Sequence, residues 1–169
     1  MSLPTELTTS PPQYWEDSIE KILKELGDEA QINAYLHKKS HDYYTTLNIK
    51  YQLPIIVLSA VSGTGNFISA NFPAYAEIII LAVGGVSIFT SIISSVAQFL
   101  KVSQLSESHR ISYLSWEKFH SNIKFQLQKR RENRDNLKDF LSVIVPEYQR
   151  LKEISATVPT HICDQVKRN

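Results

Sequence analysis

Two long stretches without a charged residue occupy the middle of the chain and constrain its fold more than any other feature. They cover residues 51–76 and 78–100, and only Glu77 separates them. Each is longer than the roughly 20 helical residues that cross the hydrocarbon core of a bilayer. A backbone surrounded by lipid must satisfy its own N–H and C=O groups, so such stretches become helices. The sequence therefore predicts a two-helix transmembrane hairpin over residues 51–100.

The two stretches differ in how strongly they favour a span. Residues 78–100 carry large apolar side chains along their whole length, whereas the first stretch contains Pro54 and a polar run over residues 62–66. A proline at this place either starts a new helix or kinks a continuous one, and both alternatives stay open. The segment Asn71-Phe72-Pro73 favours a turn between the spans. We expect Glu77 to cap the second helix rather than to relay protons.

Basic residues near the spans predict the orientation of the hairpin. They flank it on both outer sides and are absent from the connector, and such residues favour the cytosolic side. Both chain termini are therefore expected on that side. The basic residues that flank the hairpin, and on which the predicted orientation depends, are Lys38, Lys39, Lys50, Lys101 and Arg110.

An alternative to the membrane hairpin is that the two apolar helices form the buried core of a soluble helical protein.

Amphipathic soluble helices are predicted on both sides of the hairpin. Residues 1–13 are rich in Thr, Ser and Pro and are expected to form a flexible arm. Residues 14–50 show helical periodicity, with a stop and restart at Gly27-Asp28. After the hairpin the apolar stripe continues, so the second span is expected to run on into a long helix region over residues 101–156. Residues 157–169 are polar enough to form a tail.

The soluble helices are expected to pack through their largest apolar side chains. Burying each large one contributes roughly 1.5–3 kcal/mol. The residues predicted to make this packing are Trp15, Ile19, Leu23, Trp116, Phe119 and Ile123. The basic run over residues 129–135 interrupts the stripe and is expected to be a bend or a solvated stretch.

Small residues at helical spacing follow both apolar stretches. Stripes of this kind let helices in lipid approach closely and share hydrogen bonds. The alternative is that the stripe lines a water-filled pore in an oligomer. Serine alone indicates a pore only weakly, and no charge lies within the second span, so helix packing is favoured. The predicted packing residues are Ser59, Gly63, Gly84, Ser87, Ser91 and Ser95.

Patterns typical of catalysis or cofactor binding do not emerge from the sequence. Cys163 lies near His161, but no third group would orient such a pair. His37 and His41 share one helical face and would need a third ligand to hold a metal. The 129–135 run interleaves basic with acidic residues, which weakens its field for nucleic acid. We expect no enzyme activity, no cofactor, no metal and no nucleic-acid partner.

The order of several spaced residues supports a family resemblance. A helix carrying His37-Lys-Lys-Ser40 precedes the two spans, and Glu107-Ser-His109 and Trp116 follow them. Over about residues 30–130 the chain resembles the SLATT-like two-transmembrane proteins of giant and other large (nucleocytoplasmic) DNA viruses. The other residues that carry this resemblance are Tyr44, Asn48, Pro54, Leu58, Ser59, Gly63, Asn66 and Phe99.

The resemblance implies two alternative functions. Viral members look like virion structural proteins, which implies an integral membrane minor capsid component that links an internal, host-derived membrane to the capsid layer. Its partners would be the lipid bilayer, capsid or other virion proteins, and a second copy of the chain. SLATT domains of bacterial conflict systems instead imply an oligomeric pore-forming effector or viroporin. This chain shows no sensor or nucleotide-binding domain, so we favour the structural role.

Overall fold

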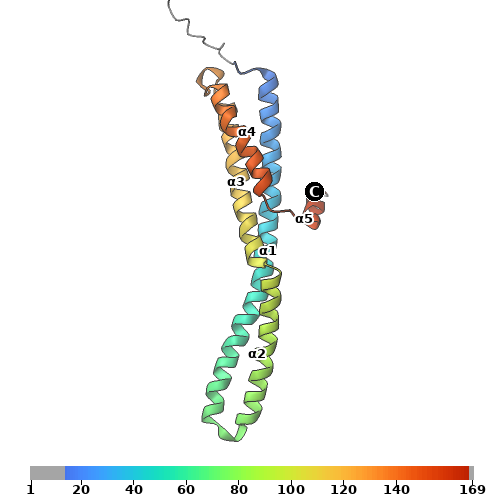
Figure 1. The fold of residues 1–169 in the computed structure, drawn as a ribbon, viewed down its shortest axis with the longest axis vertical. Coiled ribbons are helices and arrows are strands. Elements are labelled where there is room, and N and C mark those ends of the chain that lie inside the picture. Colours follow the sequence, from blue (N-terminus) through green and yellow to red (C-terminus); the bar gives the residue numbers. More distant parts are fainter. Residues whose placement is uncertain (1–13, 168–169) are drawn as a thin grey trace, which may run out of the picture. The chain divides into compact units, whose positions relative to one another are not determined.

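The computed structural model describes residues 14–167 and is built almost entirely of helices (Figure 1). No strand occurs within this range, and the all-α prediction is confirmed. The predicted arm over residues 1–13 lies outside the described residues. The elements in chain order are α1 (Asp17–Asn71), η1 (Pro73–Tyr75), α2 (Ala76–Phe99), α3 (Val102–Gln128), η2 (Arg131–Asn133), α4 (Leu137–Ile154) and α5 (Thr160–Lys167).

The described chain divides into two compact units. The first unit comprises the residues up to Tyr35 together with Ser112–Ser155. The second comprises Leu36–Ile111 and the residues from Ala156 onward. α1 and α3 each contribute one part to the first unit and the other part to the second.

α1 runs without interruption through Gly27, so the predicted break at Gly27-Asp28 is wrong. Gly27 is buried, and a Cβ atom added to it would lie 3.4 Å from Cγ2 of Ile123. The Nδ1 atom of His120 lies 2.8 Å from the Gly27 carbonyl oxygen. The glycine therefore admits a close approach of α3 to α1. α1 also continues through Pro54, which removes one backbone N–H from the helix without ending it.

The first unit is a bundle made by the start of α1, the second part of α3 and α4, which run side by side (Figure 1). Trp15, Leu23, Trp116, Phe119 and Ile123 are buried in its core, and Ile19 packs against them. All six residues predicted to pack the soluble helices therefore lie in one cluster. α4 adds three further core residues at helical spacing: Leu137, Ile144 and Leu151.

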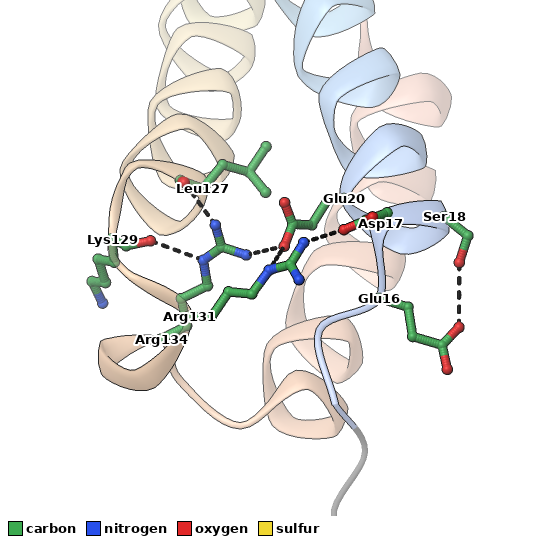
Figure 2. Close-up of polar contacts among 8 residues, drawn as sticks. All are labelled: Glu16, Asp17, Ser18, Glu20, Leu127, Lys129, Arg131 and Arg134. Carbon is green, nitrogen blue, oxygen red and sulfur yellow. Dashed lines mark hydrogen bonds and ion pairs between the residues drawn. The ribbon is translucent and has the colours of Figure 1, made fainter.

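A turn held by arginines connects α3 to α4 (Figure 2). The Arg134 side chain is only 7% exposed. Its guanidinium donates to the carbonyl oxygens of Leu127 and Lys129, at 2.9 and 3.0 Å, and to Glu20 Oε1 at 2.6 Å. It also lies over the Trp15 ring, 4.9 Å from the ring centroid. Arg134 therefore caps the end of α3 and joins it to α1.

A second arginine reinforces this connection. Arg131 donates to Glu20 Oε1 at 2.7 Å and also pairs with Asp17. The hydrogen bonds from Arg131 and Arg134 lower the pKa of Glu20. The basic run predicted to be a bend or a solvated stretch is thus a turn, and two of its arginines pair with acidic residues at the start of α1.

In the second unit, α3 follows α2 after a short interruption. The Leu100 N–H donates to the Val96 carbonyl and ends α2, and Lys101 then takes a φ of 51°. This left-handed conformation is uncommon for a residue other than glycine. The Lys101 carbonyl accepts from the Leu105 N–H at 2.9 Å, which opens α3. A long helix therefore begins directly after α2, as predicted for the region that follows the second apolar stretch.

The chain end contains more regular structure than a tail requires. α4 passes through Pro146 without ending, and residues 160–167 form α5. Ile162 of α5 is 4% exposed. Part of the predicted 157–169 tail is therefore a short packed helix.

Candidate functional site

The hairpin in the second unit joins the later part of α1 to α2. Both helices are long and apolar enough to cross a membrane. α1 ends at Asn71 and η1 begins at Pro73, so the turn predicted at residues 71–73 is confirmed. Glu77 lies in the first turn of α2, where a carboxylate interacts favourably with the helix dipole.

The apolar side chains of the hairpin are not covered by the other described residues. In the most apolar window of each helix, 6% and 0% of the residues are buried. Monomeric soluble proteins rarely expose contiguous apolar patches larger than a few hundred Å². Within residues 14–167 the hairpin is therefore not a buried core, and for this part of the single molecule that alternative is wrong. The large exposed side chains include Leu53, Ile56, Val57, Val61, Phe67, Ile78, Leu81, Ile88, Phe89, Ile92 and Phe99.

A regular seam joins the two helices of the hairpin. Half-buried residues recur every three or four positions on both helices, which marks the faces that meet. The closest approach is at Gly65, where an added Cβ atom would lie 2.5 Å from Cγ2 of Val83. The seam residues are Ile55, Leu58, Ser62, Gly65 and Ser69 on α1, and Ala76, Ile79, Val83, Val86, Thr90 and Ile93 on α2.

The predicted small-residue stripe lies beside this seam rather than in it. Cβ atoms added to Gly63 and Gly84 would meet nothing within 4 Å. The predicted contact through these glycines is therefore not made within the chain, because the helix faces that meet are rotated by about one residue. All six predicted packing residues are exposed: Ser59, Gly63, Gly84, Ser87, Ser91 and Ser95.

The serine hydroxyls of the stripe have partners in their own helix. Ser91 Oγ donates to the Ser87 carbonyl at 2.9 Å, and Ser95 Oγ donates to the Ser91 carbonyl at 2.8 Å. A hydroxyl satisfied in this way costs little to place against lipid. Ser59, Ser87 and Ser91, together with Ser62 and Thr90, border a shallow depression along the seam.

A buried histidine cluster joins α1 to α3 in the same unit. The Nδ1 atoms of His37 and His109 lie 2.9 Å apart, and the side chains are 3% and 0% exposed. The Tyr44 ring stacks on His109 with a centroid distance of 5.4 Å and an interplanar angle of 9°. His41 Nδ1 lies 3.0 Å from the Ser106 carbonyl, and Ser106 Oγ lies 2.8 Å from Thr45 Oγ1. Tyr43 places its ring edge-on to His161 of α5, 4.7 Å away.

Burial shifts both paired histidines toward the neutral form. Desolvation, with a smaller effect of His109, lowers the pKa of His37 to about 4. Desolvation, with a smaller effect of His41, also lowers the pKa of His109. The pair is therefore uncharged near neutral pH.

The cluster was not predicted from the sequence, although a signal for it existed. His109 occupies the apolar stripe of α3, and His37 shares a helical face with Ser40 and Tyr44. A histidine on a buried stripe needs a polar partner, and each of these is the partner of the other. His37 faces His109 rather than combining with His41. Among the described residues, no group of three or more His, Cys, Asp or Glu side chains is arranged to hold a metal ion.

Comparisons with models of known protein families, with curated proteins and with solved structures find no match for this chain. The resemblance to SLATT-like viral proteins therefore stays a prediction from the sequence.

Proposed function

We propose that the protein is an integral membrane structural protein whose hairpin is embedded in a bilayer and whose three-helix bundle contacts other proteins. The observation that carries this proposal is the uncovered apolar surface of α2 and the later part of α1. Lipid covers such a surface without a protein partner, and the backbone of both helices is internally hydrogen-bonded. The first unit exposes many charged side chains, which suits it to water.

The finer proposal is a minor capsid component that links an internal, host-derived membrane to the capsid layer. The family resemblance supports it. Basic residues flank both outer ends of the hairpin, which favours the same side for both termini, cytosolic or capsid-facing. The partners would then be lipid and capsid or other virion proteins.

Labelling single cysteines in microsomes tests the hairpin. In a Cys163→Ser background, we would introduce Lys50→Cys, Asn71→Cys or Lys101→Cys and add a membrane-impermeant maleimide. The cysteines at 50 and 101 should react at once, whereas the one at 71 should react only after detergent. Equal labelling at all three positions, or recovery of the protein in the supernatant of an alkaline carbonate wash, would contradict the membrane proposal.

The link to the capsid needs a separate test. Purified virus particles would be treated with a mild detergent that removes the lipid and leaves the protein shell. A linking protein should sediment with the shell. Complete release with the lipid fraction would contradict the capsid role, whereas the proposal of a membrane hairpin would be unaffected.

A pore is the second candidate function, since Ser87, Ser91 and Ser95 form an exposed stripe on α2. The helix already satisfies the hydroxyls of Ser91 and Ser95, which weakens their need for water in a pore. Purified protein in planar bilayers should therefore be electrically silent. Conductance that is lost on Ser91→Leu would favour the pore instead.

A further inference from the structure

The His37–His109 contact is a buried hydrogen bond between two groups that titrate. It joins α1 to α3 within the unit that also contains the hairpin. A hydrogen bond between two imidazoles requires one N–H donor and one bare nitrogen acceptor. The contact therefore exists only while the two facing Nδ1 atoms share a single proton.

The Nε2 atom of His109 indicates which of the two neutral rings donates the hydrogen bond. His109 Nε2 is buried and has no hydrogen-bond partner. If His109 donates its Nδ1 proton to His37, this Nε2 is a bare acceptor. The opposite tautomer would bury an N–H without an acceptor, and unpaired buried N–H groups are the rarer of the two in proteins. We assign His109 as the donor.

Protonation changes this contact in two steps. The first proton leaves the hydrogen bond in place. It adds to His109 Nε2, or it goes to His37 while His109 moves its own proton to Nε2; in both forms His109 Nε2 carries an N–H without an acceptor. After a second proton both Nδ1 atoms are donors, and they face each other across 2.9 Å. The hydrogen bond is then lost, and two like charges repel each other in a site with little water.

The groups around the pair offer little compensation for added charge. His41 on α1 is itself titratable, and on α3 the Glu107 carboxylate is engaged by Arg110 at 2.7 and 2.9 Å. On α5, His161 lies against Tyr43. Tyr44 covers one face of His109 with an aromatic ring. The other charged side chains on this part of α1 are exposed: Lys38, Lys39 and Asp42.

We propose that the His37–His109 pair is a pH-sensitive latch, which holds α1 to α3 beside the hairpin when neutral and releases this contact when acid protonates both rings. The proposal does not depend on a virion role, because it rests only on contacts between α1 and α3. Its consequence is a separation of α1 from α3 at the level of the cluster.

Spin-label distances in the full-length chain test the latch. The labels would be attached at Asp42→Cys on α1 and Ser108→Cys on α3, both exposed positions, in a Cys163→Ser background in lipid nanodiscs. At pH 7.5 we expect one narrow distance distribution. The longer distance needs both rings charged, so a second, longer population should grow as the pH is lowered through about 4, the pKa of His37, to about pH 3. Returning the sample to pH 7.5 should restore the narrow distribution.

Matched variants identify the groups responsible. The double variant His37→Leu/His109→Phe removes both imidazole rings and fills their space with apolar side chains. The distances between its spin labels should be the same at both pH values. The control variant is His120→Gln. His120 contacts the Gly27 carbonyl in the first unit, so this variant should respond to pH as the unmodified chain does. An unmodified chain whose distance is constant from pH 7.5 to about pH 3 would overturn the proposal, and so would a double variant that still responds.

A second measurement covers the case in which the double variant does not fold. Imidazole nitrogen resonances of the unmodified chain report protonation directly. We expect His37 and His109 to titrate well below pH 6.5 and in two coupled steps. Independent titration of both rings near pH 6.5 would overturn the latch.

Discussion

Gly65 of α1 and Val83 of α2 lie so close together that a Cβ atom at residue 65 would be 2.5 Å from Cγ2 of the valine. Valine in a helix is stiff about χ1, so it cannot easily turn away. The hairpin thus has one tight contact where a side chain is excluded. Gly63, two residues earlier, faces open space and makes a natural comparison.

Gly65→Val should loosen the hairpin. Overpacking a well-packed contact costs about 1–3 kcal/mol, because the two helices must move apart. Gly63→Val places the same side chain where nothing lies within 4 Å and should have little effect. Disulfide cross-linking between Ser62→Cys and Ser87→Cys, which border the same depression, would measure the contact in membranes in a Cys163→Ser background. Equal cross-linking in the two valine variants would contradict the seam.

Phe119→Ala should destabilise the helical bundle by about 3–5 kcal/mol, because it removes a ring that is 1% exposed and leaves a cavity. Phe125→Ala on the same helix removes a ring that is 67% exposed and should cost far less. Thermal unfolding followed by helicity, together with limited proteolysis of α3, would measure the difference. If the two variants unfold at the same temperature, the bundle core is assigned wrongly.

Arg134→Ala should release the turn between α3 and α4. The substitution removes bonds to two carbonyl oxygens and one carboxylate, and a hydrogen bond to a charged group is worth about 1.5–3 kcal/mol. Arg150→Ala is the control, since its pair with Glu147 is largely exposed and should contribute about 0–1 kcal/mol. Faster amide exchange at the end of α3 in the first variant alone is the expected result.

Stability should fall with acid through His37. Its folded pKa of about 4 lies below the ordinary value of 6.5, so the unfolded chain binds more protons between these two pH values. The stabilisation is complete above about pH 6.5, is lost as the pH falls toward 4, and changes no further below that. The shift corresponds to about 3 kcal/mol.

The pH dependence of stability due to the two histidines can be separated from that due to the carboxylates by comparing the unmodified chain with a variant that lacks both histidines. The pKa of Glu20 is also lowered, so its contribution is present above pH 4.5 and is lost below it. Unfolding midpoints from pH 7.5 to 4 should therefore fall less in His37→Leu/His109→Phe than in the unmodified chain, mainly between pH 6.5 and 4.5. Parallel curves for the two proteins would show that the histidines do not stabilise the neutral form.

Local patterns in the sequence determined the helical class, the two apolar helices and the turn at residues 71–73. These features depend on properties that neighbouring residues carry together, namely the absence of charge, helical periodicity and an asparagine followed two residues later by a proline. The apolar stripe likewise indicated the core around Trp116 and Phe119, because large apolar residues on one helical face are buried wherever a partner helix exists.

Tertiary structure alone decided which helix faces meet. Gly27 continues a helix rather than ending it because Ile123 packs against it, and the seam passes through Gly65 rather than Gly63 because of how α2 is rotated. His37 pairs with His109, 72 residues away, although His41 is nearer in the chain. Each outcome depends on the rotation and approach of helices distant in sequence, which helical periodicity specifies only to within about one residue.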